Sequence, residues 1–337
     1  MIREAIQALV SGNPLTMEEA ASVMEEIMED KVTPAQFGAF VTALRLKGET
    51  IDEIAGMAKT MRAKAVQVNT AEPMIDVVGT GGDGLNTFNI STATALVVAG
   101  AGLKVAKHGN RAASGGCGAA DVLEALGVKI ELTAEQVQRC IEEVGMGFMF
   151  APSFHPAMKY AGPPRREIGI RTVFNILGPL TNPARAGNYL LGVADGALVE
   201  KLALVLQGLG CSHAMVVHGE DGLDEITLTG KTQVAELKDG RIESYSVSPE
   251  DFALPRASLD SLRGDTADEN ATLLRNVLAG TPGPQRDVVL MNATAALVAG
   301  DKVPSLEQGI GLAREAIDSG RALVRLEQLI ELSQSFA

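Results

Sequence analysis

The chain has 337 residues, of which 46% are hydrophobic and 21% charged, enough for a large core divided between one large and one smaller domain. Its formal net charge of −13 argues against broad contact with nucleic acid or with an anionic membrane. The three cysteines lack zinc-ligand spacing, and no signal pattern or bilayer-length apolar run is present, so we expect a cytoplasmic protein with reduced thiols.

The first 70 residues carry repeated helix-start signals. Three segments begin with a threonine that is followed three residues later by Glu or Gln, the pattern of a capping box, and Pro34 occupies a first helical position. The three pairs are Thr16 with Glu19, Thr33 with Gln36, and Thr50 with Glu53. The apolar residues after each start recur at helical spacing, which predicts a small helical bundle.

From residue 75 onward, short apolar runs alternate with helical stretches. This alternation predicts an α/β domain with a mostly parallel central sheet, whose ligands bind where strands end. Residues 226–247 instead predict an antiparallel excursion that turns at 238–240, and the last 75 residues return to helix. The apolar runs are 75–78, 103–106, 147–150, 189–193 and 213–217, and the later helices are 267–278, 286–299 and 305–319.

One stretch, at about 152–185, interrupts this rhythm with six prolines and a cluster of Arg165, Arg166 and Arg171. We expect two helices here, broken at 162–164 and stopped at 178–179. If this insertion packs on the N-terminal helices, the smaller domain is discontinuous. The helical domain is then 1–70 plus about 152–185, and the α/β domain is 71–151 plus about 186–337.

A glycine-rich loop follows the first predicted strand. Gly79, Gly81 and Gly84 satisfy the dinucleotide-binding pattern, but the next strand ends in Lys107-His108 and not in the acid that would hold ribose hydroxyls. A lysine there suits a 2′-phosphate, so a nicotinamide-dependent oxidoreductase is kept as an alternative. A phosphate-binding loop explains more of the pattern.

The phosphate interpretation rests on three neighbouring features. Successive glycines let backbone N–H groups converge on an anion, and residues 89–92 open a helix whose dipole faces the same ligand. Lys107, Asn110 and Arg111 then end the neighbouring strand, where they can neutralise phosphate oxygens. Far along the chain, Asp224 and Glu225 provide carboxylates of the kind magnesium prefers, if the fold returns them to this loop.

Seven short motifs occur together and in order along the chain. They are GTGGD (79–83), NIST (89–92), KHGNR (107–111), ADVLEALG (120–127), FAPSFHPAMK (150–159), RREIGIRTVFNILGPLTNPA (165–184) and HGEDGLDEIT (218–227). With them the chain closely resembles the anthranilate phosphoribosyltransferases, which share a larger family with pyrimidine nucleoside phosphorylases. The resemblance runs essentially from end to end.

The resemblance implies a small helical domain hinged to a larger α/β domain, and a homodimer formed through the helical domain. It implies transfer of the phosphoribosyl group of 5-phosphoribosyl 1-pyrophosphate to the amine of anthranilate in tryptophan biosynthesis, with Mg²⁺ as cofactor. Small-molecule substrates are the implied partners, without nucleic acid or membrane.

The resemblance also assigns residues, position by position. Magnesium would be served by Ser91, Asp224 and Glu225, and anthranilate would be met by Gly79, Asn110, Arg165 and His155. The phosphoribosyl pyrophosphate site would comprise Gly79, Gly82, Asp83, Thr87, Asn89, Ile90, Ser91, Thr92, Lys107, His108, Gly109, Asn110, Arg111, Ser114, Gly115 and Ala119.

The loop at 115–119 departs from the family pattern, because it lacks side-chain hydroxyls and a cation between Ser114 and Ala119. Backbone N–H groups can still bind phosphate there, and we expect weaker or more flexible binding of the sugar phosphate.

The implied reaction needs no covalent nucleophile, since an aromatic amine is already neutral near neutral pH. Catalysis by positioning and electrostatics is therefore expected, with His108 the candidate for any acid–base role. Loss of Ser91 or Asp224 should reduce turnover more than loss of any cysteine. Two rivals are a pyrimidine nucleoside phosphorylase and a non-catalytic, nucleic-acid-binding relative; the Asp224-Glu225 pair argues against both, and the net charge against the second.

Overall fold

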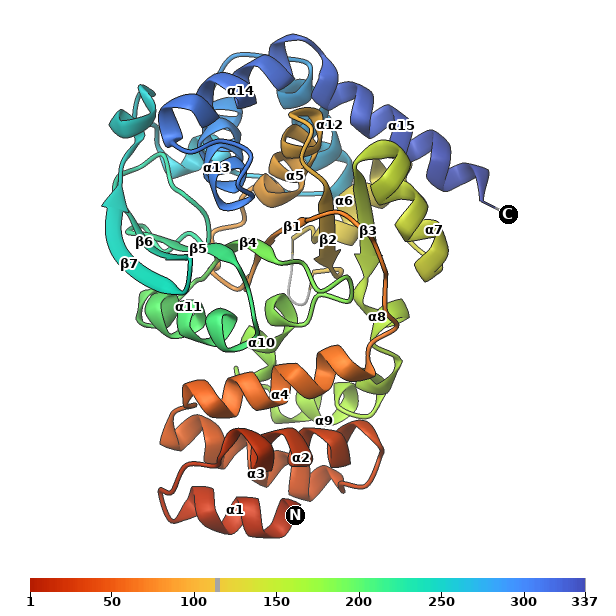
Figure 1. Cartoon of the computed structure of the whole chain (residues 1–337), viewed down its shortest axis with the longest axis vertical. Helices are drawn as coiled ribbons and strands as arrows, with labels where there is room; N and C mark the ends of the chain where they lie inside the picture. Colours follow the sequence, from red (N-terminus) through yellow and green to blue (C-terminus); the bar gives the residue numbers. More distant parts are fainter. Residues whose placement is uncertain (113–115, 337) are drawn as a thin grey trace.

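The computed structural model describes residues 1–112 and 116–336. A stack of helices at the N-terminal end is joined to a larger body in which helices flank a twisted sheet (Figure 1). None of the helices in these described ranges combines the length and apolar character needed to cross a membrane.

Three of the four N-terminal helices begin where the capping signals predict. The four helices are α1 (Ile2–Val10), α2 (Met17–Met28), α3 (Pro34–Lys47) and α4 (Ile51–Lys64), and the three predicted capping boxes are formed at the starts of α2, α3 and α4. In the box that starts α4, Glu53 is completely buried and also bonds to groups outside the box. The Glu53 carboxylate accepts hydrogen bonds from the Leu15 and Thr50 amides at 2.9 and 2.7 Å, and pairs with Lys47 at 2.9 Å.

Seven strands form one sheet in the order β3-β2-β1-β4-β5-β6-β7. Strands β1 to β5 are parallel, and β6 and β7 form the antiparallel excursion that the sequence predicts within residues 226–247. Residues 226–231, which were included in that prediction, precede the strands as a loop. The strands are β1 (Ile75–Gly79), β2 (Val105–Gly109), β3 (Met146–Phe150), β4 (Asn188–Gly192), β5 (His213–Gly219), β6 (Thr232–Lys238) and β7 (Arg241–Val247).

The central strands are buried on both faces, so they are mostly apolar instead of alternating. In β4, Leu190 belongs to the core shared with α5 and α13, whereas Tyr189 and Leu191 face the core shared with α11 and α4. Figure 1 shows these layers above and below the sheet. The helices of this body are α5 (Ile90–Gly100), α6 (Ala119–Ala125), α7 (Ala134–Arg139), α11 (Val199–Gly208), α12 (Ala267–Leu278), α13 (Pro284–Ala299), α14 (Leu306–Asp318) and α15 (Arg321–Ser335).

The proline-rich insertion contains three short helices, α8 (Ala151–Phe154), α9 (Gly162–Ile168) and α10 (Phe174–Leu177). The expected helix break at 162–164 was wrong, because Gly162-Pro163-Pro164 begins α9. Proline is tolerated in a first helical turn, where its missing N–H would have had no partner. The insertion packs on the N-terminal helices, and the Phe37 and Phe174 rings lie 5.4 Å apart.

Candidate active site

A cleft of about 510 Å³ lies at the carboxyl ends of the parallel strands. It is next to the point where the sheet order reverses, since β1 lies between β2 and β4, and open α/β sheets bind ligands at such a crevice. The insertion supplies the other wall. The sequence-predicted residues that line it are Gly79, Gly82, Asp83, Thr87, Asn89, Ile90, Ser91, Lys107, His108, Gly109, Asn110, Arg111, Ala119, Arg165, Asp224 and Glu225.

Two strand-end glycines create the niche that holds Asp224. Gly79 of β1 and Gly192 of β4 are paired in register, and a Cβ atom on either would overlap Asp224. The Asp224 Oδ2 accepts a hydrogen bond from the Gly81 amide at 2.7 Å. The fold thus returns the acidic pair to the glycine loop, as the magnesium hypothesis requires.

The acidic pair is buried beside further negative charge. Burial, reinforced by the nearby Asp83 carboxylate, raises the pKa of Asp224 to about 7. Burial and the charge of Asp224 raise the pKa of Glu225 well above its usual range, although Lys107 opposes this. Carboxylates crowded in this way suit a divalent cation, which would relieve their repulsion. Within 1–112 and 116–336 no three His, Cys, Asp or Glu side chains form a ready metal cage, so Mg²⁺ would also need the Ser91 hydroxyl, substrate oxygens and water.

Lys107 is almost completely buried, with 1% of its surface exposed. Its Nζ donates to the Val77 carbonyl at 2.6 Å and to the Ser91 hydroxyl at 3.2 Å. Burial lowers the pKa of Lys107, while Asp76, Glu225 and Asp224 act in the opposite direction. This lysine therefore binds the Ser91 hydroxyl and partly offsets the negative charge of the acidic pair.

The N-terminus of α5 is left open toward the cleft. Asn89 is its N-cap, yet the Asn89 side chain makes no capping hydrogen bond. Its Nδ2 donates to the Cys117 carbonyl at 2.8 Å, and its Oδ1 accepts from Asn270 at 3.0 Å. Sequence reasoning missed Asn270, which is 181 positions away from Asn89 and carries no local signal of its role. Helix α5 begins at Ile90, within the segment 89–92 that the sequence predicts to open it.

The wall formed by the insertion carries Arg165, whose guanidinium lies 5.1 Å from the centre of the Phe174 ring. Burial lowers the pKa of Arg165, and no carboxylate pairs with it among the described residues. Arg111 also lines the cleft, but its guanidinium donates to Asp121 and Glu124 of α6 at 3.0 and 2.8 Å. Of these two arginines, Arg165 is the one that is available to a carboxylate ligand.

Two predicted site residues do not line the cleft, and two others fall outside the part of the chain that the structure describes. Thr92 and His155 are buried behind it, and Ser114 and Gly115 lie outside the described residues. The His155 ring centroid is 5.0 Å from that of His108. Burial lowers the pKa of His108 to about 3, with a contribution from His155, and that of His155 to about 4. Neutral imidazoles of such low basicity are poor proton acceptors.

Arg171 is a second feature whose role the sequence did not reveal, although it belongs to the predicted arginine cluster. It reaches from the insertion to the glycine loop, where its Nη1 donates to the Gly82 carbonyl at 2.6 Å and its Nη2 to the Gly81 carbonyl at 3.3 Å. It therefore links the two walls of the cleft.

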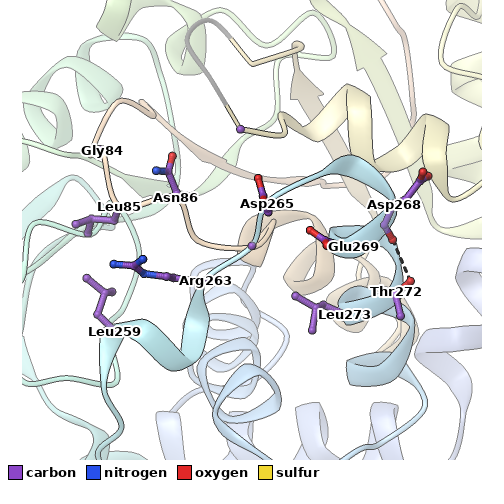
Figure 2. Close-up of a pocket in the computed structure, with 12 residues that line it drawn as sticks. Gly84, Leu85, Asn86, Leu259, Arg263, Asp265, Asp268, Glu269, Thr272 and Leu273 are labelled. Carbon is purple, nitrogen blue, oxygen red and sulfur yellow. Dashed lines mark hydrogen bonds between the residues drawn. The ribbon is translucent and has the colours of Figure 1, made fainter.

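A larger groove of about 990 Å³ adjoins the cleft and shares Asn86 and Asp265 with it. Figure 2 shows three carboxylates in this groove, from Asp265, Asp268 and Glu269, which belong to α12 and the segment leading into it. Among the described residues that line it, Arg263 is the only basic one. An anionic substrate therefore fits the smaller cleft better.

Comparison with known proteins agrees with this geometry. Residues 71–323 match the model of the α/β domain of a glycosyl transferase family, and residues 3–65 match the helical bundle domain of the same family. The anthranilate phosphoribosyltransferase of Chloroflexus aurantiacus is 61% identical over 99% of both chains, and that of Dehalococcoides mccartyi is 59% identical over 100% of this chain and 99% of the relative.

Solved structures give the same result. The Thermus thermophilus enzyme superposes with a TM-score of 0.93 at 45% identity, covering 98% of this chain and 99% of that one. The Saccharomyces cerevisiae enzyme in complex with phosphoribosyl pyrophosphate and Mg superposes with a TM-score of 0.91 at 30% identity, covering 99% and 98%. Family models, full-length relatives and fold all agree, and the chain belongs to the anthranilate phosphoribosyltransferase family.

Proposed function

We propose that the chain transfers the phosphoribosyl group of 5-phosphoribosyl 1-pyrophosphate to the amine of anthranilate, giving N-(5-phosphoribosyl)anthranilate and pyrophosphate for tryptophan biosynthesis. One observation carries the proposal. A single cleft brings together the glycine loop, the open N-terminus of α5 and the Asp224-Glu225 pair, while Arg165 stands on the opposite wall. Full-length identity to the family supports the same reaction.

The residues divide the substrates between the two walls. Backbone N–H groups of the glycine loop and of the α5 N-terminus suit the phosphates, because fixed dipoles stabilise charge without reorganising. The planar guanidinium of Arg165 matches a carboxylate, and Asn110 lies in the same cleft. This arrangement aligns the anthranilate amine with the anomeric carbon of the ribose.

The transfer requires alignment more than acid–base chemistry. The amine lone pair forms the N–C bond as the C–O bond to pyrophosphate breaks, and pyrophosphate leaves with that electron pair. The nitrogen then releases one proton to water or to the departing pyrophosphate. The low basicity of His108 and His155 supports a mechanism in which neither histidine removes it.

Ser91, Asp224 and Glu225 would hold Mg²⁺, with Asp83 close by. When bound, Mg²⁺ supplies positive charge to the pyrophosphate oxygens. The raised pKa values of Asp224 and Glu225 support this assignment, because a cation would favour their ionised forms.

We also infer the domain division given by the sequence: 1–70 plus about 152–185 as a helical domain, and 71–151 plus about 186–337 as a substrate-binding domain, with a hinge between them in a cytoplasmic homodimer. Contacts of α9 with α3 and of Phe174 with Phe37 support the first part. The homodimer is the arrangement that the resemblance to the family implies.

The proposal is tested by following the loss of anthranilate fluorescence with phosphoribosyl pyrophosphate and Mg²⁺, with EDTA as the metal control. Asp224→Asn should lower turnover by about 100-fold or more, since it removes a charged ligand worth several kcal/mol. Asp239→Asn, the same change in the exposed β6–β7 turn, should leave turnover unchanged. A folded wild-type protein that consumes no anthranilate would refute the proposed function.

A further inference from the structure

Arg171 makes a contact that the proposed reaction does not by itself require. It lies between α9 and α10, and the turn that follows it is fixed by a hydrogen bond from the Thr172 amide to Asn175 at 2.9 Å. Its guanidinium donates to two successive carbonyls of the glycine loop, those of Gly82 at 2.6 Å and Gly81 at 3.3 Å. A side chain of the insertion thus holds the backbone of the opposite wall.

The planarity of the peptide bond makes this contact consequential. In a trans peptide unit the C=O and the following N–H point in opposite directions. Because Arg171 holds the carbonyls of Gly81 and Gly82, the N–H groups of Gly82 and Asp83 are turned away from it. Within the described chain, neither of these two amides donates a hydrogen bond to another protein group.

Two adjacent N–H groups that point the same way form an anion-binding concavity. Gly81 and Gly82 have φ values of +64° and +76°, which allow the turn. Two reasons favour glycine at position 82: its φ is positive, and a Cβ there would overlap the Arg171 guanidinium. The preceding Gly81 amide is bound to Asp224, so the loop is fixed from both sides.

We infer that Arg171 is a positioning residue: by holding the Gly81 and Gly82 carbonyls, it directs the Gly82 and Asp83 amides toward a phosphate group of the substrate. This inference rests on the proposed function and extends it. Arg171 acts on phosphoribosyl pyrophosphate through the backbone, and the anthranilate carboxylate is left to Arg165. If Arg171 instead contacted a substrate directly, its replacement would leave the order of the glycine loop unchanged when no substrate is bound.

The experiment therefore combines kinetics with hydrogen exchange in the absence of substrate. In Arg171→Gln, the KM for phosphoribosyl pyrophosphate should rise about tenfold, as expected for loss of a charge-assisted hydrogen bond. The KM for anthranilate should stay within about twofold, and exchange at the Gly81 amide of the free protein should accelerate by about tenfold. Arg171→Lys should give intermediate values, because an ammonium cannot match the planar fork.

Arg166→Gln is the matched control, since Arg166 is exposed on α9 and does not line the cleft. It should leave both KM values and loop exchange unchanged. If Arg171→Gln raises the KM but leaves exchange of the free loop unchanged, Arg171 is a direct ligand and the inference is wrong. A rise confined to the anthranilate KM, or no change at all, also overturns it.

Circular dichroism melting checks that the variants fold, and Arg171→Lys carries the test if Arg171→Gln does not. The two hypotheses fail separately. Absence of turnover in the wild-type protein would refute the proposed function, whereas the exchange measurement needs no turnover and still decides whether Arg171 orders the glycine loop.

Discussion

Replacing Glu53 by alanine should destabilise the helical domain far more than the same change in an equivalent capping box. Glu53 is completely buried, and its carboxylate serves the Leu15 amide, the Thr50 amide and the Lys47 ammonium. Removing it leaves a buried amide without a partner, at about 1–3 kcal/mol, and strips a 10%-exposed lysine of its counter-charge. Together these losses amount to about 3–5 kcal/mol, the range for breaking a buried pair.

Glu19→Ala provides the comparison. Glu19 occupies the same position in the box that starts α2, but it is exposed, and its carboxylate accepts hydrogen bonds from Thr16 alone among the described residues. Its loss should cost about 0.5–1.5 kcal/mol. Urea unfolding followed by circular dichroism at 222 nm measures both, a suitable probe for a chain without tryptophan. A Glu53→Ala effect within about 1 kcal/mol of the Glu19→Ala effect would refute the reasoning, because burial would then add nothing to the bond.

Two further outcomes follow from the structure. His213 lies between Asp301 and Glu236 at 2.7 and 2.8 Å; burial opposes its protonation, but the carboxylates outweigh burial and raise its pKa. The stabilisation from the charged imidazole is therefore complete below the unfolded pKa of about 6.5 and is lost as pH rises through the higher folded pKa. The Tm should fall over that pH interval. A His213→Gln protein whose Tm falls in the same way would contradict this prediction. Asn270→Ala should raise the KM for phosphoribosyl pyrophosphate about tenfold by freeing the Asn89 side chain at the start of α5, measured by steady-state kinetics, with an unchanged KM as the contrary result.

Local signals sufficed for much of the fold. The capping boxes lie within three residues of the groups they bond, so the starts of α2, α3 and α4 follow from short stretches of sequence. The five parallel strands could be predicted from their apolar runs, because strands buried on both faces are predominantly apolar. The helix break expected at Gly162-Pro163-Pro164 failed because proline both ends and begins helices, and only the surrounding packing selects between them.

In the candidate site too, some features could be predicted from local sequence and others depend on tertiary packing. The glycine loop and the acidic pair carry their chemistry in their own residue types, and the resemblance to the family supplied their roles. Asn270 and Arg171 are different, because each acts on backbone or side-chain groups far away in sequence. Their contacts depend on how α12 and the insertion pack, and no spacing encodes that. The burial of His155 behind His108 is likewise a product of tertiary packing.

The glycine niche around Asp224 gives the two walls of the cleft unequal freedom to evolve. A methyl group at Gly79 would overlap the Asp224 carboxylate, and one at Gly192 would overlap the Asp224 backbone carbonyl, so these two strand ends accept glycine only. The acceptor wall around Arg165 and Phe174 belongs to a separate insertion, where a Cβ on the cleft-lining Gly178 would meet no other group of the described chain within 4 Å. Laboratory selection for altered acceptors should therefore accumulate substitutions in the insertion while the strand ends remain unchanged.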